Sequence, residues 1–131
     1  MIRPATINDV PAITELMKLN QFWQDNWRDD VLERAITSTD SLALVWEETD
    51  QIHGFVCAHD CAFRGYLSEL VVRKSHRGRG IARALLERIQ QELAINGCAS
   101  LIADVWHSAE TFYKSLGWSE PDVKLLRKKC R

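Results

Sequence analysis

Several patterns that would place the chain in a specialised class are missing from its sequence. No apolar run approaches the ~20 residues that a membrane-spanning helix needs, and the first residues do not resemble a secretory signal. The cysteines follow no C-x-x-C spacing typical of a zinc or redox site; they are Cys57, Cys61, Cys98 and Cys130. We therefore expect a cytoplasmic protein with reduced thiols, no bound metal and no contact with a membrane.

An excess of charge, internal repeats and low-complexity tracts are missing as well. The formal net charge is −1 over 131 residues, so a general nucleic-acid-binding surface is not expected, although basic residues cluster within 73–83 and 124–131. No linker divides the chain, and its length suffices for one hydrophobic core but not for two. We expect residues 1–131 to form a single domain.

The stretch 66–86 passes from an apolar, β-branched run through a basic loop into an amphipathic helix. Arg77, Gly80 and Ala82 match the spacing R/Q-x-x-G-x-G/A, with Gly78 and Ile81 at positions between them. The first N–H groups of a helix point out of its positive end, and glycine lets a phosphate approach them closely. Further positive charge comes from Arg73, Lys74, Arg79 and Arg83. The pattern predicts a cradle for a diphosphate.

Other ligand-binding patterns fit this stretch less well. A Walker loop requires Gly-Lys followed by Ser or Thr, which the chain does not contain. The dinucleotide fingerprint G-x-G-x-x-G/A would need Gly or Ala where Arg83 stands. The Arg-Gly run could belong to an RNA-binding tract, but it is a single copy between two apolar elements. A solvated glycine loop at a helix start is the remaining alternative.

Hydrophobic periodicity and turn residues predict alternating strands and helices. We expect helices at 9–19, 29–37, 80–96 and 109–116, and strands at 1–4, 42–46, 52–58, 66–72, 101–105 and 123–129. Gly54 marks a bulge or a close packing contact, and Gly97 ends the long helix. This order predicts an α/β fold in which antiparallel strands come first and a β-α-β crossover follows.

A second segment follows the glycine loop. Residues 108–118, SAETFYKSLGW, resemble the pattern A-x-x-F-Y-x-x-x-G-F/W. Together the two segments make the region from Gly65 to Trp118 resemble the GNAT superfamily of N-acetyltransferases, which bind acetyl-CoA, and the start I-R-P-A-T-x-x-D is similar too. The resemblance implies a single-domain GNAT fold: a mixed central sheet with a V-shaped splay between the strands at 66–72 and 100–105, and helices on both faces.

The resemblance also implies roles for individual residues. Tyr113 would be the general acid for the departing thiolate. The alternative role for Tyr113 is that of an amphipathic residue that packs beside the core. Glu69 would be the general base, acting through a water molecule, because a lone carboxylate in an apolar strand needs a cleft or an ion pair; the alternative is a pair with Arg64 or Arg73. The family often has Asn where His107 stands. The expected coenzyme contacts are Leu70, Val71, Val72, Arg77, Gly78, Arg79, Gly80, Ile81, Ala82, Arg83 and His107.

In this architecture the acceptor site lies between the splayed strands and the loop that joins the first two helices. The candidates there are Trp23, Asp25, Trp27 and His59. Aromatic faces and carboxylates suit a cationic amine, although two core tryptophans and a solvated acidic helix start would give the same pattern. His53 and His76 are expected at the surface.

We therefore expect an acetyl-CoA-dependent N-acetyltransferase that moves the acetyl group directly to a primary amine of a small molecule. Two alternatives stay open: a protein N-terminal or lysine acetyltransferase, and a non-catalytic acyl-CoA-binding regulatory module. Acetyl-CoA and the amine are the expected partners, and nucleic acid is not. Edge strands and a partly aromatic surface are compatible with a homodimer.

Overall fold

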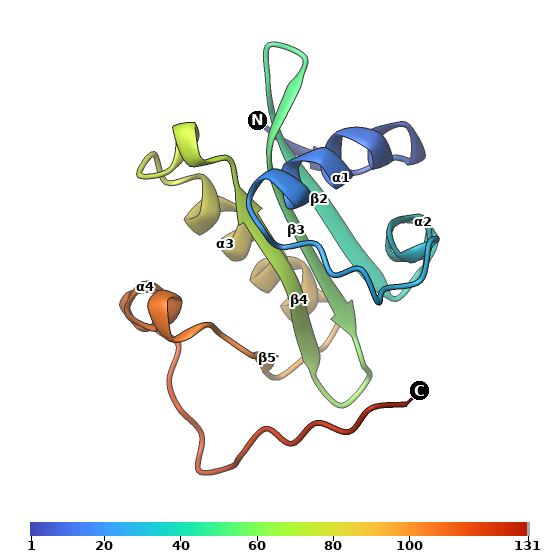
Figure 1. The fold of residues 1–131 in the computed structure, drawn as a ribbon. Helices are drawn as coiled ribbons and strands as arrows, with labels where there is room; N and C mark the ends of the chain where they lie inside the picture. Colours follow the sequence, from blue (N-terminus) through green and yellow to red (C-terminus); the bar gives the residue numbers. More distant parts are fainter. Residues whose placement is uncertain (131) are drawn as a thin grey trace.

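Residues 1–130 are described by a computed structural model with one mixed sheet and helices on both of its faces (Figure 1). The strands lie in sequence order: β1 (Ile2–Pro4), β2 (Ser41–Glu48), β3 (Gln51–Asp60), β4 (Gly65–Val72) and β5 (Leu101–Ala103). The first four are antiparallel, and β5 runs parallel to β4. The helices are α1 (Val10–Leu19), α2 (Val31–Thr37), α3 (Ile81–Ile95) and α4 (Glu110–Ser115), with short 3-10 turns η1 (Ile7–Asp9), η2 (Lys74–His76) and η3 (His107–Ala109).

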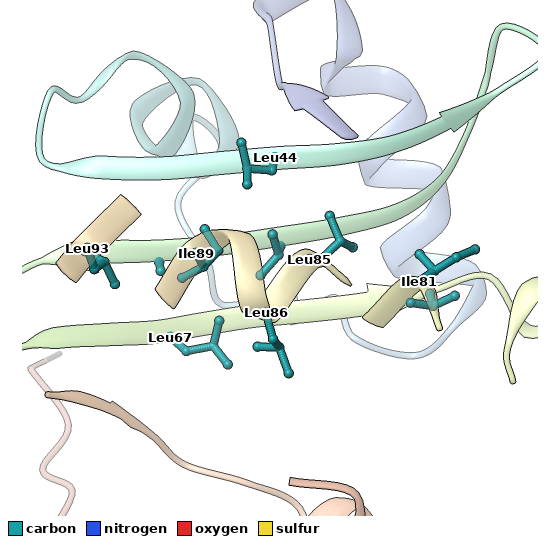
Figure 2. Packing of buried hydrophobic residues seen from close by; sticks show 10 residues of the cluster. Leu44, Leu67, Ile81, Leu85, Leu86, Ile89 and Leu93 are labelled. Atoms are coloured by element: carbon teal, nitrogen blue, oxygen red, sulfur yellow. The ribbon is translucent and has the colours of Figure 1, made fainter. Parts of the chain in front are cut away.

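The helix α3 packs lengthwise on one face of the sheet. Its buried residues repeat at the predicted four-residue spacing, and Figure 2 shows Ile81, Leu85, Ile89 and Leu93 among the strands. Gly54 on β3 permits this close approach, since a Cβ there would lie 3.1 Å from Ile81 Cγ2. The contact confirms Gly54 as a packing position and holds the first turn of α3 next to the end of β4.

The opposite face of the sheet is covered by α1 and α2, whose apolar sides form a second core. Ile13, Leu16 and Met17 of α1 and Leu32 of α2 are buried against Phe55 and other inward side chains of the strands. Burying each such side chain is worth about 1.5–3 kcal/mol, so both helices are held firmly by packing. The two helices are joined by an irregular loop that crosses the sheet near β4 (Figure 1).

The strand β4 contains an irregularity, and its pairing with β5 ends at the same point. Opposite β3, Cys57 faces Glu69 while Ala58 faces Leu67, so Ser68 is an extra residue, a β-bulge. On the other side, β5 pairs with β4 only over Gly65–Leu67. Beyond the bulge that edge of β4 is therefore unpaired, and the predicted splay between the two strands is confirmed.

Two expectations about the second half of the chain are corrected. The strand expected at 101–105 ends at Ala103, and residues 123–129 form no strand. Val123, Leu125 and Leu126 are at least 73% exposed, and the segment runs free of the sheet (Figure 1). Local alternation of apolar residues does not make a strand where no neighbouring strand accepts its hydrogen bonds.

All four cysteines are free thiols, with Cys57 buried in the sheet. Within residues 1–130 no helix has both the length and the hydropathy of a membrane-spanning segment.

Candidate active site

Two cavities lie on opposite sides of the β4 bulge. The larger cleft, of about 1080 Å³, opens where β4 and β5 part. Its walls come from β4, the glycine loop, the start of α3, residues 103–107, α4, the loop after α1 at residues 20–24, and Arg127. The smaller pocket, of about 650 Å³, lies under α2 on the other face. Ser68 and Glu69 line both cavities, so the bulge is their common wall.

The glycine loop presents the first turn of α3 to the larger cleft. Gly78 and Gly80 have φ angles of +78° and +82°, a conformation that glycine adopts without strain, and Gly80 is the N-cap of α3. Ile81, Ala82 and Arg83 line the cleft, and no acidic residue occupies this first turn. The positive end of a 15-residue helix is thus uncompensated and accessible, as a diphosphate site requires.

Ten of the eleven expected coenzyme contacts line the larger cleft, and Arg79 is the exception. Its guanidinium turns away from the cleft and pairs with the carboxylate of Glu48 on β2, at 2.6 and 3.2 Å. Arg77 lines the cleft while its guanidinium donates to the Val72 carbonyl at 3.0 Å and to Asn20 Oδ1 at 2.9 Å. The side chain of Arg77 therefore ties the end of β4 to the end of α1.

A cluster behind the glycine loop corrects the expectation for His53. This side chain is buried, accepts a hydrogen bond from Arg73 Nε at 3.1 Å and stacks on His76 at 3.7 Å. Burial, together with the charges of His76 and Arg73, lowers the pKa of His53. Glu48, His53 and His76 offer ligand atoms within 4.8 Å of one another, but Arg73 and Arg79 already occupy His53 and Glu48. We interpret the cluster as the anchor that fixes the loop to the β2–β3 hairpin.

Glu69 faces the junction of the two cavities without an ionic partner. The alternative of a pair with Arg64 or Arg73 is not seen, and among residues 1–130 no cation forms an ion pair with this carboxylate. Burial is the main cause that raises the pKa of Glu69 to about 7, with the nearby charge of Asp104 as a second cause. A carboxyl group with this proton affinity can both take and return a proton near neutral pH.

Tyr113 lies across the larger cleft on α4. Its ring packs edge-to-face against Phe112 and Trp118, with centroids 5.5 and 5.3 Å apart. Burial first, and then the charges of Asp104 and Glu69, raise the pKa of Tyr113 to about 12. The phenol therefore keeps its proton at neutral pH. Asp104 itself accepts a hydrogen bond from the Tyr66 hydroxyl, which holds this charge at the mouth of the splay.

The smaller pocket brings together two of the four expected acceptor residues. Trp27 and His59 line it, whereas Asp25 is exposed and does not. Trp23 also stays outside the wall; it packs edge-to-face on Trp27 at 5.2 Å and lies under the ammonium of Lys18. Trp23 thus buttresses Trp27 and does not contact the cavity.

His59 is held in one orientation by two hydroxyl groups. Its Nδ1 lies 2.9 Å from Ser41 Oγ and its Nε2 lies 2.8 Å from Ser68 Oγ. Because Ser68 donates its own proton to the Cys57 carbonyl, at 3.1 Å, Nε2 must carry the imidazole proton and Ser41 must donate to Nδ1. Burial lowers the pKa of His59, so the ring is neutral at neutral pH.

Some residues of the site were not expected from the sequence. Ser68 becomes part of both cavities only through the bulge, which leaves no recognisable signal in a strand of alternating residues. Arg28 and Arg34, near and on α2, line the smaller pocket, and Asp104 lines the larger cleft. No signal in the sequence indicated Asp104, because the strand expected at 101–105 included it and β5 ends at Ala103.

Comparisons with known proteins agree with this arrangement. The family model of the acetyltransferase (GNAT) domain matches residues 10–131. Among solved structures, glucosamine-6-phosphate N-acetyltransferase from Arabidopsis thaliana is 20% identical and superposes with a TM-score of 0.79 over 98% of this chain and 97% of its own.

Two aminoglycoside acetyltransferases are similar as well. AAC(6')-Iy in complex with a bisubstrate analogue is 22% identical, with a TM-score of 0.81 over 99% of this chain and 98% of its own. The enzyme meta-AAC0020, from an uncultured soil metagenomic sample, is 18% identical, with a TM-score of 0.78 over 100% of this chain and 96% of its own. AAC(6')-Iy has also been crystallised with CoA. The glycine loop, the splayed sheet and the match over nearly the whole chain lead to one conclusion: the protein belongs to the GNAT family of acetyltransferases.

Proposed function

We propose that this enzyme transfers the acetyl group of acetyl-CoA directly to a primary amine of a small molecule. The observation that carries the proposal is the shared wall at Ser68 and Glu69, where a cleft suited to a coenzyme and a pocket suited to an acceptor meet. Two substrates bound on either side would have their reacting ends at the bulge, and this proximity supplies much of the catalysis.

The larger cleft fits the parts of acetyl-CoA in order. The diphosphate suits the start of α3, where a Cβ added at Gly78 or Gly80 would meet no protein atom within 4 Å and would instead extend into open space. The amide-containing pantetheine arm suits the unpaired edge of β4 at Leu70, Val71 and Val72, which has main-chain groups without a neighbouring strand. When bound, acetyl-CoA supplies a thioester whose carbonyl carbon is open to attack.

The side chains at the junction supply the proton transfers. The amine nitrogen bonds to the thioester carbonyl carbon, the carbon–sulfur bond breaks, and the electron pair leaves with the sulfur. Glu69, directly or through a water molecule, takes the proton that the nitrogen loses, and Tyr113 gives its proton to the sulfur. The products are an N-acetyl amine and free CoA, and solvent returns the proton from Glu69 to Tyr113.

The pocket favours a small molecule over a polypeptide acceptor. It is a cavity of about 650 Å³ beneath a helix, within the size range of small-ligand sites. The similar structures named above are enzymes for an amino sugar phosphate and for aminoglycosides, which are small amines. A non-catalytic binding module would not need both Glu69 and Tyr113, each with a raised pKa, in the wall of one cleft. A cytoplasmic location is part of the proposal, in line with four free thiols.

The test is release of CoA from acetyl-CoA with a panel of amines, beside an equilibrium binding assay for acetyl-CoA. Amino acids, amino sugars, their phosphates, polyamines, aminoglycosides and short peptides form the panel. We expect acetyl-CoA to bind and one class of small amine to be acetylated. Binding with turnover of peptides alone would contradict the small-molecule acceptor, and the lack of acetyl-CoA binding would refute the proposal as a whole.

A further inference from the structure

The smaller pocket has a charge pattern opposite to the one expected from the sequence. The acids of the loop before α2 do not line it: Asp25 and Asp29 are exposed elsewhere, and Asp30 pairs with Arg28 at 3.2 Å. The cations that do line it are Arg28 and Arg34. The charged part of the wall is therefore basic on the side of α2.

The guanidinium of Arg34 is available for a ligand. It projects from an exposed position of α2, and no carboxylate in residues 1–130 forms an ion pair with it. Arg28 is engaged by Asp30, but both of these side chains are more than half exposed, so this ion pair is weak and can exchange for a ligand anion. A guanidinium offers a planar fork of donors that matches a carboxylate or a phosphate.

The opposite wall adds no fixed negative charge to balance these arginines. Its hydroxyl, imidazole and carboxyl groups belong to Ser41, Ser68, His59 and Glu69. The imidazole of His59 is held neutral between two hydroxyl groups. Glu69 is the one carboxylate in the wall, and with a pKa of about 7 it is partly protonated at neutral pH and is needed for the amine itself.

We propose that the acceptor is a primary amine that also bears an anionic group, a carboxylate or a phosphate, and that Arg34, assisted by Arg28, binds this group while the amine faces Glu69. This inference rests on the proposed acetyl transfer and narrows its substrate class. A polyamine or an aminoglycoside carries several positive charges, which would meet the two arginines and no acid in the wall besides Glu69. Trp27, Val31 and Phe55 cover the apolar middle of such a molecule.

The experiment compares matched acceptors that differ in the anionic group. Glucosamine 6-phosphate is compared with glucosamine, and β-alanine with β-alaninamide, with spermidine and an aminoglycoside as cationic acceptors. The wild type should give the higher kcat/KM with the anionic member of at least one pair, and which pair responds distinguishes phosphate from carboxylate. Arg34→Gln should lower kcat/KM for that anionic acceptor at least about tenfold, because it removes a charged hydrogen-bond donor from the anionic group.

The controls separate this inference from the proposed function. Arg34→Gln should lower kcat/KM much less for the member of the pair that lacks the anionic group than for the member that bears it. Arg88→Gln, on α3 away from both cavities, should change neither value. Preferred turnover of spermidine or the aminoglycoside would overturn the inference while acetyl transfer stands. The inference would also be overturned if Arg34→Gln and Arg28→Gln each kept the higher kcat/KM for the anionic acceptor. Binding of acetyl-CoA without turnover of any amine would instead refute acetyl transfer to small amines, and the inference with it.

Discussion

Glu69 is the residue whose environment differs most from that of an ordinary surface carboxylate. Its pKa of about 7, against an ordinary value of 4.5, means that the folded protein keeps a proton between these pH values that the unfolded chain has lost. This proton stabilises the folded state fully below about pH 4.5, and the benefit is lost as the pH rises through about 7.

Replacing Glu69 by Gln should abolish this pH dependence. The free energy of unfolding of Glu69→Gln minus that of the wild type should increase between pH 4.5 and pH 7. A tenfold change in proton affinity is worth ~1.4 kcal/mol, so the increase is at most ~3 kcal/mol, and less because Glu69 is partly exposed to screening solvent. Urea unfolding of both proteins across this range measures it, and taking the difference cancels the titration of the histidines. A constant difference would show that Glu69 titrates normally.

The same variant should lose activity in a way that depends on pH. With an acceptor amine of low basicity, the kcat/KM of the wild type should rise as the pH passes about 7, since Glu69 must be ionised to act as a base. Glu69→Gln should lose this rise and about 10²-fold or more in kcat/KM. A variant that keeps the rise near pH 7 would exclude Glu69 as the base.

Replacing Tyr113 by Phe should lower kcat by at least about tenfold while the KM for acetyl-CoA changes little, because in the proposed mechanism the hydroxyl gives its proton to the leaving sulfur in the transition state. Tyr66→Phe is the matched control: it removes a hydroxyl that bonds Asp104 outside the reacting centre and should lower kcat far less. Steady-state kinetics of both variants give the comparison. Equal losses would mean that Tyr113 is only a packing residue.

At the scale of single residues, the sequence indicated those candidate site residues whose type is unusual for their position. Glu69 stands alone in an apolar strand, and Tyr113 belongs to a recognisable motif; the structure places both at the larger cleft. Asp25 and His53 were misjudged, because the direction of a loop carboxylate and the burial of a strand histidine depend on packing between distant segments. Arg34 was missed because a lone arginine on an exposed helix position looks like ordinary solvated charge.

Among the elements, the glycine loop with the first turn of α3 is the proposed binding site of the coenzyme diphosphate. Gly80 and Gly97 offer a matched comparison, since both have positive φ and an added Cβ at either meets nothing within 4 Å. Gly80→Val and Gly97→Val should each lose roughly 1–2 kcal/mol of stability from backbone strain. Only Gly80→Val should also bind acetyl-CoA more than about tenfold more weakly, because its side chain enters the place of the diphosphate.

Thermal unfolding and equilibrium binding of acetyl-CoA measure the two effects separately. Similar losses of affinity in both glycine variants would assign the effect to general destabilisation. Tight binding by Gly80→Val would remove the glycine loop from the coenzyme site.

Elements with strong local signals were predictable, and those that depend on a neighbour were not. The helix α3 follows from apolar residues at four-residue spacing with a glycine before and after it. The bulge at Ser68 depends on how β3 and β4 come into register, and the failed strand at 123–129 depends on a partner strand that residues 1–130 do not supply. Neither is visible in a local pattern.

Over the whole molecule, positive charge is concentrated near the larger cleft while the net charge is only −1. Salt should therefore act on the binding of the anionic coenzyme and not on the protein in general. Raising NaCl from about 0.05 M to about 0.5 M should increase the KM for acetyl-CoA several-fold by screening. The KM for an acceptor without an anionic group should stay constant, and parallel changes in both constants would contradict local attraction.

In the proposed function, the helix α2 belongs to the acceptor pocket alone and the glycine loop to the coenzyme cleft alone, and this division has a consequence for divergence within the family. The acceptor wall formed by α2 lies within the first 40 residues, whereas the coenzyme loop belongs to the β4–α3 segment, and only the bulge is common to both. Mutations in the seven-residue helix α2 can thus change which amine is accepted and leave the coenzyme site intact. A gene duplicate could acquire a new substrate by drift in that helix alone, while selection preserves the remainder of the catalyst.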